Sequence, residues 1–512
     1  MPLPPTPPSR SAQMARTLDT EICIVGAGIA GLFAVLTLPE GTDVVVLDKG
    51  YEGIGSSPLA QGGMAAAVGP GDSWQSHLDD TLQAGAGLVD RRSAEVVCRE
   101  VPDRIRDLVD YGCGFDRNPD GSLNLAREGG QSVPRSVHRM DATGAEVVRA
   151  LRAAADSRFR RAEARATSLA LSDGRCTGVW AASDEELLLV RARATLLASG
   201  GAGALFAFTT NAPASTGDAL ALAHRAGARM IDLEFVQFHP TVLKVESSPM
   251  PLLTEALRGA GALLVDASGR RFMLGAHPDA ELAPRHVVTA GIMRAGDAFL
   301  DARPVGHDRL ESEFPTVTAS CLEHGFDITR EPVPVTPAAH YMIGGAGTRL
   351  DGSTSVPGLF AAGECATTGM HGANRLAGNS LAEAVVFARR AALAMTAYRP
   401  TAGSDPEWET PPAGPAPIDE RMRAEIVAAV SMGAGPVRDA ASCAAGLTRL
   451  EGLTAEAQGR DGGDAGSEAS AMLASGKLLV RGALAREESR GVHVRSDFPA
   501  PRLSYEGIHL DL

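Results

Sequence analysis

The sequence predicts an α/β protein that begins with a Rossmann-like dinucleotide-binding domain and ends with a helical domain. Two features carry this prediction. A strand, a glycine loop, a helix and a second strand follow one another from Glu21, and helix-like periodicity returns after a Pro/Gly/Ser-rich stretch at 400–417. The 512 residues, 44% apolar and 21% charged, suit a globular protein of about three domains.

The N-terminal unit is the clearest element. Glu21–Val25 is expected as a buried strand, Gly26-Ala-Gly-Ile-Ala-Gly31 follows it, and a helical pattern continues to about Leu38. A second buried strand, Asp43–Asp48, ends in an acid. In this setting the glycines let N–H groups approach a pyrophosphate, the helix dipole favours its charge, and Asp48 can accept from a ribose hydroxyl. Glycine pairs alone also close ordinary turns, so the prediction depends on the surrounding strand, helix and acid.

The later elements follow from periodicity and turn residues. They are a loop at 55–64, a helix from a capping box at Thr143 to about Ala155, strands at 194–199 and 358–364, a helix at 380–397, and helical patterns at 418–453 and 469–489 on either side of a flexible 458–466.

Composition excludes several classes of protein. Lys and Arg number 48 against 62 Asp and Glu, a net charge of −14, which argues against a nucleic-acid or anionic-membrane surface. Seven cysteines without a C-x-x-C pair argue against a zinc ribbon or disulfide scaffold; we expect no metal site and a reducing, cytoplasmic location. The uncharged stretch 194–217 is too rich in Gly and Thr for a membrane span. Residues 1–18 are expected to be a disordered tail.

Four cationic side chains stand in apolar or glycine-rich sequence. They are His239, Arg285, His340 and Arg375. Taken singly, such a histidine is more often a satisfied core residue, and such an arginine more often lies on a solvated face.

The order of the motifs resembles the succinate dehydrogenase/fumarate reductase flavoprotein family. The resemblance rests on the Glu21–Asp48 unit, AQGG at 60–63, FHPT at 238–241, LLTEALRG at 252–259, APR at 283–285, PAAHY at 337–341, and AAGE at 361–364 with HGANRLAGNSL at 371–381. It spans about 19–399, and ESRGVH at 488–493 and DFP at 497–499 extend it into the C-terminal part.

The resemblance implies a domain order and a cofactor. It implies an FAD-binding domain at 19–232 and 342–399, interrupted by an α+β capping domain at 233–341 and followed by a linker at 400–417 and a C-terminal helical domain at 418–512. Ser56–Gln61 holds no histidine, so FAD is expected to bind non-covalently, without the flavin-linking His of respiratory members. The expected contacts are Gly26, Ala27, Gly28, Ile29, Ala30, Gly31, Asp48, Lys49, Ser56, Ser57, Ala60, Gln61, Gly62, Gly63, Gly200, Asp218, Glu364, Asn379, Ser380 and Leu381.

The implied substrate is a four-carbon dicarboxylate held between FAD and the capping domain. The residues expected to bind its carboxylates are His239, Thr254, His340 and Arg375. His239 and His340 flank the capping domain and Arg285 lies on it, so closing the cap would gather all three and exclude water. The family assigns proton transfer to Arg285, which needs a relay because guanidinium hardly deprotonates. Glu255 and Arg258 would supply it; the alternative is a plain ion-pair network.

Glu128 separates branches of the family. The resemblance implies that a carboxylate here pairs with an α-ammonium, whereas members acting on plain diacids carry an apolar residue; a solvated loop carboxylate is the alternative. Gln131, Pro58 and Leu59 differ from the residues usual at these positions in the family, so the sequence does not define the wall of the site on the flavin side.

The expected activity is FAD-dependent oxidation of L-aspartate to iminosuccinate, with oxygen (giving hydrogen peroxide) or fumarate as acceptor. The product would pass to quinolinate synthase on the route to NAD. Alternatives are a soluble fumarate reductase or succinate dehydrogenase flavoprotein subunit, and a flavin-binding protein without turnover.

Overall fold

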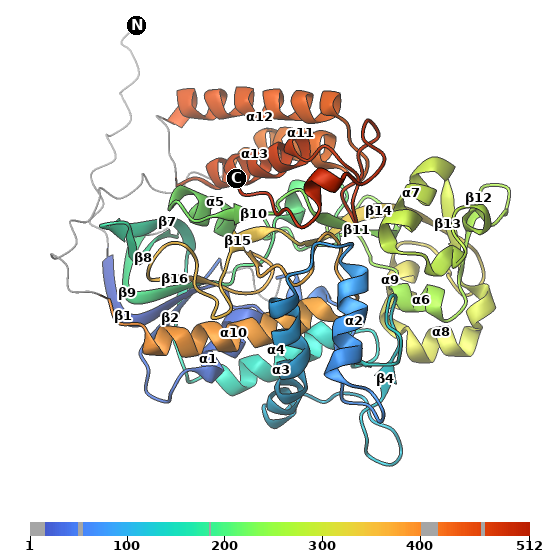
Figure 1. Cartoon of the computed structure of the whole chain (residues 1–512), viewed down its shortest axis with the longest axis horizontal. Coiled ribbons are helices and arrows are strands. Elements are labelled where there is room, and N and C mark those ends of the chain that lie inside the picture. Colours follow the sequence, from blue (N-terminus) through green and yellow to red (C-terminus); the bar gives the residue numbers. More distant parts are fainter. Residues whose placement is uncertain (1–15, 50–54, 184–185, 401–417, 462–465) are drawn as a thin grey trace, which may run out of the picture.

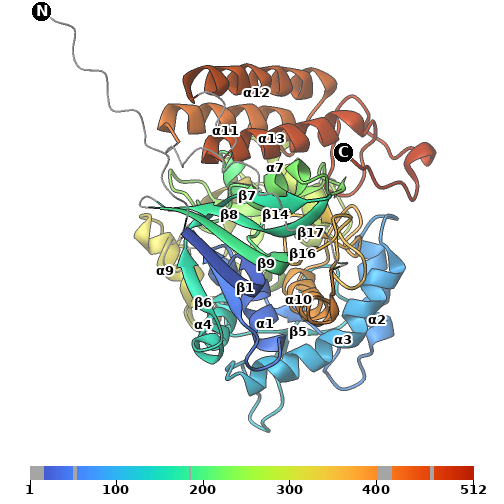
Figure 2. The same cartoon turned by 90° about the vertical axis from the view of Figure 1, so that its left-hand side faces the viewer.

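The computed structural model describes residues 16–49, 55–183, 186–400, 418–461 and 466–512. A central sheet has helices on both of its faces, and a separate lobe of sheet and short helices lies to one side (Figure 1). Seen from the side, three C-terminal helices form a layer above the sheet (Figure 2).

The central sheet has the strand order of a Rossmann-like fold. Its parallel part runs β6-β2-β1-β9-β16, and β8 and β7 extend it as an antiparallel hairpin paired to the first half of β9. These strands are β1 (Arg16–Val25), β2 (Val44–Asp48), β6 (Arg160–Glu163), β7 (Arg165–Ser172), β8 (Arg175–Ala182), β9 (Leu187–Leu197) and β16 (Leu359–Ala361).

Both faces of this sheet are buried, which explains the unbroken apolar runs. In β1, Cys23 and Val25 pack into one core, whereas Ile22 and Ile24 pack into the core on the opposite face. Alternating residues therefore serve two layers, and neither face needs polar side chains.

The helices divide between the two faces. One face carries α1 (Ile29–Thr37), α3 (Arg91–Asp110), α4 (Thr143–Ala155) and α10 (Asn379–Ala397), with α2 (Trp74–Ala84) against α3. The other carries α5 (Asp218–Arg225) and the C-terminal helices α11 (Glu420–Ala434), α12 (Ala440–Asp461) and α13 (Glu468–Ala485).

The side lobe has its own antiparallel sheet, in the order β11-β14-β13-β12, and its own apolar core. Its elements are β11 (Val236–Leu243), β12 (Leu263–Asp266), β13 (Ala298–Asp301), β14 (Val333–Met342), α6 (Glu255–Gly259), α7 (Arg285–Ala295), α8 (His307–Glu313) and α9 (Pro315–Glu323). The predicted boundaries of the capping domain stay a prediction.

Short elements connect these parts. The strands are β3 (Met64–Ala65), β4 (Leu125–Ala126), β5 (Ser136–Val137), β10 (Met230–Ile231), β15 (Gly345–Gly347) and β17 (Ala366–Thr367). The 3₁₀ turns are η1 (Ser57–Leu59), η2 (Gly203–Leu205), η3 (Phe272–Gly275), η4 (Ala280–Leu282), η5 (Arg303–Val305) and η6 (Leu503–Tyr505).

Three local predictions were wrong. Residues 16–18, expected in the tail, belong to β1, because they pair with β9. Thr143 does not cap α4: Ala142 precedes the helix, and the Thr143 hydroxyl accepts from the backbone N–H of Arg139 instead. The single helical pattern at 418–453 is split into α11 and α12 near Gly435, and α12 continues to Asp461, into the stretch expected to be flexible.

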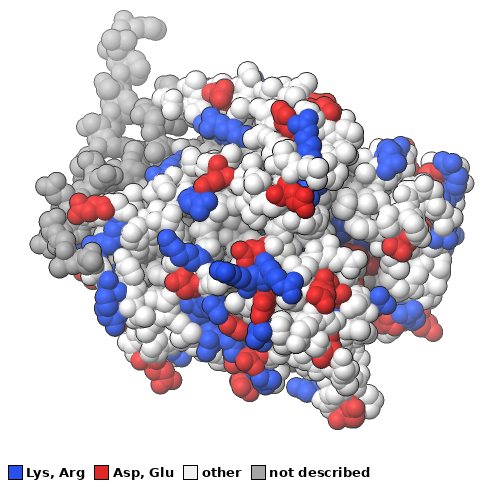
Figure 3. Space-filling model, in the orientation of Figure 1, with Lys and Arg blue, Asp and Glu red and all other residues white. Residues whose placement is uncertain are grey.

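The remaining predictions about the termini and linkers fall partly outside the described residues. This applies to 1–15 of the expected tail and to 401–417 of the expected linker. None of the helices in the described part of the chain combines the length and apolar character needed to cross a membrane. On the face seen in Figure 3, acidic and basic side chains are interspersed.

Candidate active site

A large cleft opens at the carboxyl ends of β1 and β2. It encloses about 1600 Å³ of empty space, counting its open mouth, and reaches from the glycine loop to His340 and Arg375. Ligands of open α/β sheets bind at this edge, where the strand order reverses.

The glycine loop allows the backbone to make a tight turn against neighbouring strands. Gly26 has φ of +111°, and a Cβ there would overlap the backbone of Ala198. A Cβ on Gly31 would overlap the carbonyl of Gly26, so this glycine permits α1 to pack closely on β1. The N-terminus of α1 is left facing the cleft, where an anion is favoured.

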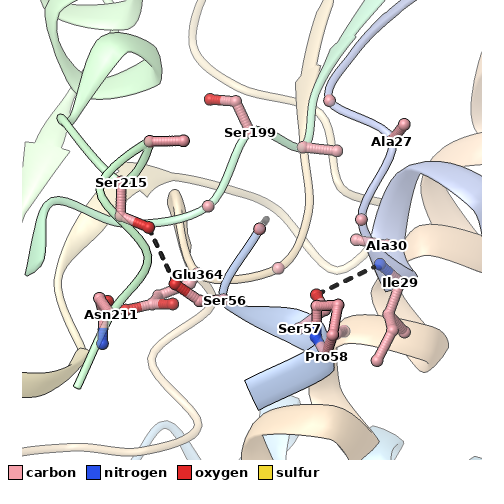
Figure 4. A pocket seen from close by; sticks show the side chains of 18 of the residues that line it. Ala27, Ile29, Ala30, Ser56, Ser57, Pro58, Ser199, Asn211, Ser215 and Glu364 are labelled. Atoms are coloured by element: carbon pink, nitrogen blue, oxygen red, sulfur yellow. Dashed lines mark hydrogen bonds between the residues drawn. The ribbon is translucent and has the colours of Figure 1, made fainter. Parts of the chain in front are cut away.

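Hydroxyl groups lie on two sides of the cleft, with Ser57 beside Ile29 and Ser56 beside Ser215 (Figure 4). Ser57 Oγ accepts from the backbone N–H of Ile29 at 3.4 Å, and Ser56 Oγ lies 2.8 Å from Ser215 Oγ. Lys49 Nζ donates to Thr216 Oγ1 at 2.6 Å and pairs with the carboxylate of Asp218.

Several buried polar atoms around the cleft accept or donate no hydrogen bond within the described part of the protein. They include Ser199 Oγ, Asn211 Oδ1 and Asp218 Oδ1. Buried polar groups are normally satisfied, so these atoms mark contacts for a large polar ligand. Together with the helix N-terminus, they fit the pyrophosphate, ribose and ring system of a flavin dinucleotide.

Most of the residues predicted to contact FAD line the cleft. They are Gly26, Ala27, Gly28, Ile29, Ala30, Asp48, Lys49, Ser56, Ser57, Ala60, Gly200, Asp218, Glu364, Ser380 and Leu381. Gly31, Gln61, Gly62, Gly63 and Asn379 do not line it. The Asn379 side chain points elsewhere, bonded to His77 and Thr81 of α2, and Asp48 accepts a long hydrogen bond from Arg161 at 3.3 Å.

The two predicted histidines lie side by side at the end of the cleft, which His340 lines. Their ring centroids are 5.3 Å apart, with His239 on β11 and His340 on the neighbouring β14. His239 Nδ1 donates to the carbonyl of Thr241 at 3.1 Å, which leaves Nε2 as the free nitrogen. Burial, followed by Arg285, lowers the pKa of both imidazoles well below the ordinary value.

A glutamine joins the two predicted arginines. Gln237 Oε1 accepts from Arg285 Nη1 at 2.9 Å and from Arg375 Nη2 at 2.8 Å. Arg375 comes from the loop before α10 and also donates to Ser380 Oγ at 2.9 Å. Burial and the nearby Arg285 lower the pKa of Arg375 to about 10.

The predicted relay residues are in contact. Arg285 Nε donates to Glu255 Oε2 at 2.6 Å, and Arg258 Nη2 lies 3.8 Å from the same oxygen. Burial alone would raise the pKa of Glu255, but the two arginines hold it below the ordinary value, while burial lowers the pKa of Arg258. Thr254 caps α6 just before Glu255.

Glu128 is not a solvated loop carboxylate. Its Oε1 accepts from the backbone N–H of Gly63 at 2.7 Å, and burial raises its pKa. Gln131 holds the loop: its Oε1 accepts from the N–H of Glu128 at 3.0 Å, and its Nε2 donates to Ser136 Oγ and to the carbonyl of Ala377.

The sequence analysis missed several residues of the site. Gln237 could have been noticed immediately before the FHPT motif, two residues before His239. Thr210, Asn211 and Ser215 lie in the uncharged stretch that drew attention only as a possible membrane span; Thr210 Oγ1 lies 2.9 Å from His340 Nδ1. Glu364 was expected at the cofactor, and burial raises its pKa to about 7.

Comparisons with known proteins place this site in a family. Residues 21–381 match the FAD binding domain family, and residues 423–504 match the fumarate reductase flavoprotein C-terminal family. An L-aspartate oxidase of Streptomyces coelicolor is 44% identical over 94% of this chain and 89% of its own. Another, from Caulobacter vibrioides, is 44% identical over 93% of each chain. A quinol fumarate reductase chain of E. coli superposes with a TM-score of 0.87 at 29% identity, covering 97% of this chain and 94% of that one.

Proposed function

This chain belongs to the FAD-binding flavoprotein family of the L-aspartate oxidases and fumarate reductases, and we propose that it oxidises L-aspartate to iminosuccinate. The observation that carries the proposal is a half-buried carboxylate, Glu128, beside a buried cluster of two arginines and two histidines.

FAD is the cofactor, and it supplies the two-electron acceptor for the C–H bond that breaks. Gly26, Gly28 and the N–H groups at the start of α1 would hold its pyrophosphate. Ser199 and Asn211, whose side-chain oxygens lack partners among the described residues, would meet its polar edges.

The two carboxylates of the substrate need donors at both ends. Arg375 supplies a fixed planar cation, and His239, His340 and Thr254 supply neutral or protonated donors around it. The pKa of His239 is lowered, and its Nδ1 proton is donated to the Thr241 carbonyl. Its Nε2 can therefore donate to a substrate carboxylate only when the ring takes up a second proton. Holding the α-carbon in one position is most of the catalytic task here.

Proton transfer is assigned to Arg285. Its Nη1 is fixed by Gln237 and its Nε by Glu255, so a proton lost or gained at Arg285 can be balanced through Glu255 and Arg258. The low pKa of Arg258, caused by burial, favours such an exchange.

Glu128 separates this proposal from a plain fumarate reductase. An α-ammonium would satisfy its carboxylate, whereas succinate would leave it facing a second anion. The bridging of Arg285 and Arg375 by Gln237 argues against a flavin-binding protein without turnover, because such a protein has no use for a dicarboxylate site.

One experiment tests the proposal directly. The purified protein should be yellow and should produce hydrogen peroxide with L-aspartate, but not with succinate or D-aspartate. Turnover of succinate at a rate comparable to L-aspartate would favour the succinate dehydrogenase alternative.

The mode of FAD attachment is tested separately. With no histidine in Ser56–Gln61, acid precipitation should release all the flavin into the supernatant. Yellow colour retained by the denatured protein would contradict non-covalent binding. We further propose that the cytoplasm is the site of action and that iminosuccinate passes to quinolinate synthase on the route to NAD.

A further inference from the structure

Arg375 is a buried cation with an unusual set of partners. Its contacts among the described residues are the Ser380 hydroxyl, the Gln237 amide oxygen and the ring of Tyr341, and none of these carries a full negative charge. Its Nε has no partner there at all. Burial of a guanidinium is costly, and the nearest carboxylates, Glu128 and Glu364, act on Arg375 without contacting it, so a group in direct contact must offset part of that cost.

The ring of Tyr341 is the largest of these contacts. Arg375 Cζ lies 4.5 Å from the ring centroid, within the range of a cation–π interaction. Tyr341 is the penultimate residue of β14, next to His340, and it also lines the cofactor cleft. Its ring therefore packs against Arg375 from a strand of the side lobe.

Tyr341 is itself fixed from behind by a buried group of side chains. Its hydroxyl donates to Glu383 Oε2 at 3.2 Å. His371 Nε2 lies 3.0 Å from the same oxygen, and Thr368 donates to Oε1 at 2.5 Å. Burial, followed by Glu383, raises the pKa of Tyr341 well above its ordinary value, so the phenol stays a donor.

This arrangement stabilises a cation without neutralising it. A carboxylate beside Arg375 would compete with the substrate for the guanidinium, whereas an aromatic face cannot. A phenol that donates to an ionised carboxylate is polarised toward its ring, which strengthens the negative face that Arg375 meets.

We propose that Tyr341 is a positioning residue for dicarboxylate binding: its ring, fixed by Glu383, holds the Arg375 guanidinium and balances its charge without competing for it. The inference rests on the proposed function, because it assigns Arg375 to a substrate carboxylate. It predicts an effect on binding rather than on the chemical step.

The experiment measures succinate binding to the FAD-loaded protein by its perturbation of the flavin absorbance, and L-aspartate kinetics in parallel. Tyr341→Leu removes the ring and should raise the succinate Kd and the L-aspartate KM about tenfold to thirtyfold, with kcat changed less than about threefold. Tyr341→Phe keeps the ring but loses the hydroxyl contact to Glu383, and should raise the succinate Kd only about threefold, much less than Tyr341→Leu. Flavin content per chain is measured for every variant.

A double-mutant cycle tests whether Tyr341 acts through Arg375. In an Arg375→Lys background, which keeps the charge but not the planar group, Tyr341→Leu should weaken succinate binding by less than about threefold. An equal loss in both backgrounds, or a Kd within twofold of the parent after Tyr341→Leu alone, would overturn the inference.

A second variant covers the case in which Tyr341→Leu fails to retain FAD. Glu383→Gln leaves the ring in place and weakens its anchorage, and should raise the succinate Kd about threefold in the parent background and not in Arg375→Lys. No change in the parent background overturns the inference. A parent protein that neither binds succinate nor oxidises L-aspartate refutes the proposed function instead, so the two failures are distinguishable.

Discussion

Two enclosed arginines, Arg486 and Arg375, show how differently a protein can use a buried cation. Arg486 joins the C-terminal domain to the start of the side lobe, and every guanidinium nitrogen has an acceptor. Its Nε donates to Glu234, its Nη1 to Glu488 at 3.0 Å and its Nη2 to the carbonyl of Ile508 at 2.9 Å. Arg375 forms no ion pair within the described part of the chain, and its Nε has no hydrogen-bond partner there.

A buried arginine whose nitrogens are all paired has a structural role. An incompletely paired arginine has a functional role, provided that a cavity adjoins its unpaired nitrogen. Arg438 shows why the proviso matters. Its Nε and Nη2 also lack partners within the described part of the chain, yet Arg438 is not among the residues that line the large cleft. A cation with unpaired hydrogen-bond donors indicates a ligand site only where an adjacent cavity can hold the ligand.

The largest expected effect is on protein stability, and it follows from replacing Arg486, the fully paired arginine. Arg486→Leu leaves Glu234 buried without its ion-pair partner and removes one of the two arginines bound to Glu488, so the free energy of unfolding should fall by about 3–5 kcal/mol. The matched control is Arg375→Leu, which removes an unpaired cation and should change the unfolding free energy by less than about 1 kcal/mol. Denaturant titration of both FAD-loaded variants measures this, and equal losses would refute the comparison.

The next effect falls on turnover rather than stability. Arg285→Lys keeps the charge but loses the two fixed contacts to Gln237 and Glu255. Turnover of L-aspartate should fall by about two orders of magnitude or more, the scale of a lost acid–base group, at an almost unchanged melting temperature. Near-normal kcat with a raised KM would assign Arg285 to binding only.

A smaller and selective effect is expected at Glu128. Glu128→Gln keeps the size and the contact with Gly63 but removes the charge; a charge-assisted contact is worth about 1.5–3 kcal/mol. The kcat/KM for L-aspartate should fall about tenfold to a hundredfold, while succinate inhibition holds or improves. Equal losses for both ligands would show that Glu128 has only a structural role.

Gln131 should affect L-aspartate oxidation through Glu128, whose loop it holds. Gln131→Leu removes the side-chain contacts that hold the Glu128 loop to Ser136 and Ala377. The kcat/KM for L-aspartate should fall about threefold to tenfold, less than in Glu128→Gln, because the carboxylate is retained but less firmly held. In a Glu128→Gln background, Gln131→Leu should lower kcat/KM little further. A further threefold to tenfold loss in that background would mean that Gln131 acts independently of Glu128.

The smallest effect is the pH dependence of the ion pair between Asp232 and His509, which adjoins Arg486. Asp232, through its hydrogen bond to the ring, raises the pKa of His509 above 6.5. A raised pKa in the folded state means that the stability from this pair is fully present below the unfolded pKa and is lost as pH rises through the folded value. The difference in melting temperature between the parent and His509→Gln should therefore be larger at pH 5.5 than at pH 9. A difference independent of pH would refute the ion pair.

Local signals predicted the fold well where chain neighbours are also spatial neighbours. The strand, glycine loop, helix and second strand from β1 to β2 were all present in the sequence pattern, and α10 was predicted to within a residue. The strand order could not be read locally, because β9 pairs with β1 across more than 160 residues and with β16 from a still later segment. Residues 16–18 were misjudged for the same reason: a polar edge becomes strand only when β9 provides its partner.

The site was predictable residue by residue but not as an assembly. The resemblance supplied His239, Arg285, His340 and Arg375, while the oxygen of Gln237 that joins the arginines emerged only from packing. Tyr341 was noticed only as the last residue of the PAAHY motif, without a role, and Glu383 gave no signal, because an acid on a core helix has ordinary structural roles. The sequence did not indicate that the Asn379 side chain bonds to α2, so contact of this residue with FAD stays a prediction.

The pairing of β16 with β9 has a consequence for synthesis of the chain. When a ribosome has released β1 through β9, the parallel sheet still lacks its edge strand, and the intervening lobe must emerge before Leu359–Ala361 can dock. During that interval the apolar edge of β9 is unpaired, a state prone to aggregation, and the wall of the cleft that contains Glu364 does not yet exist. The complete flavin cleft therefore forms only after residues 359–364 have been synthesised and have docked on β9.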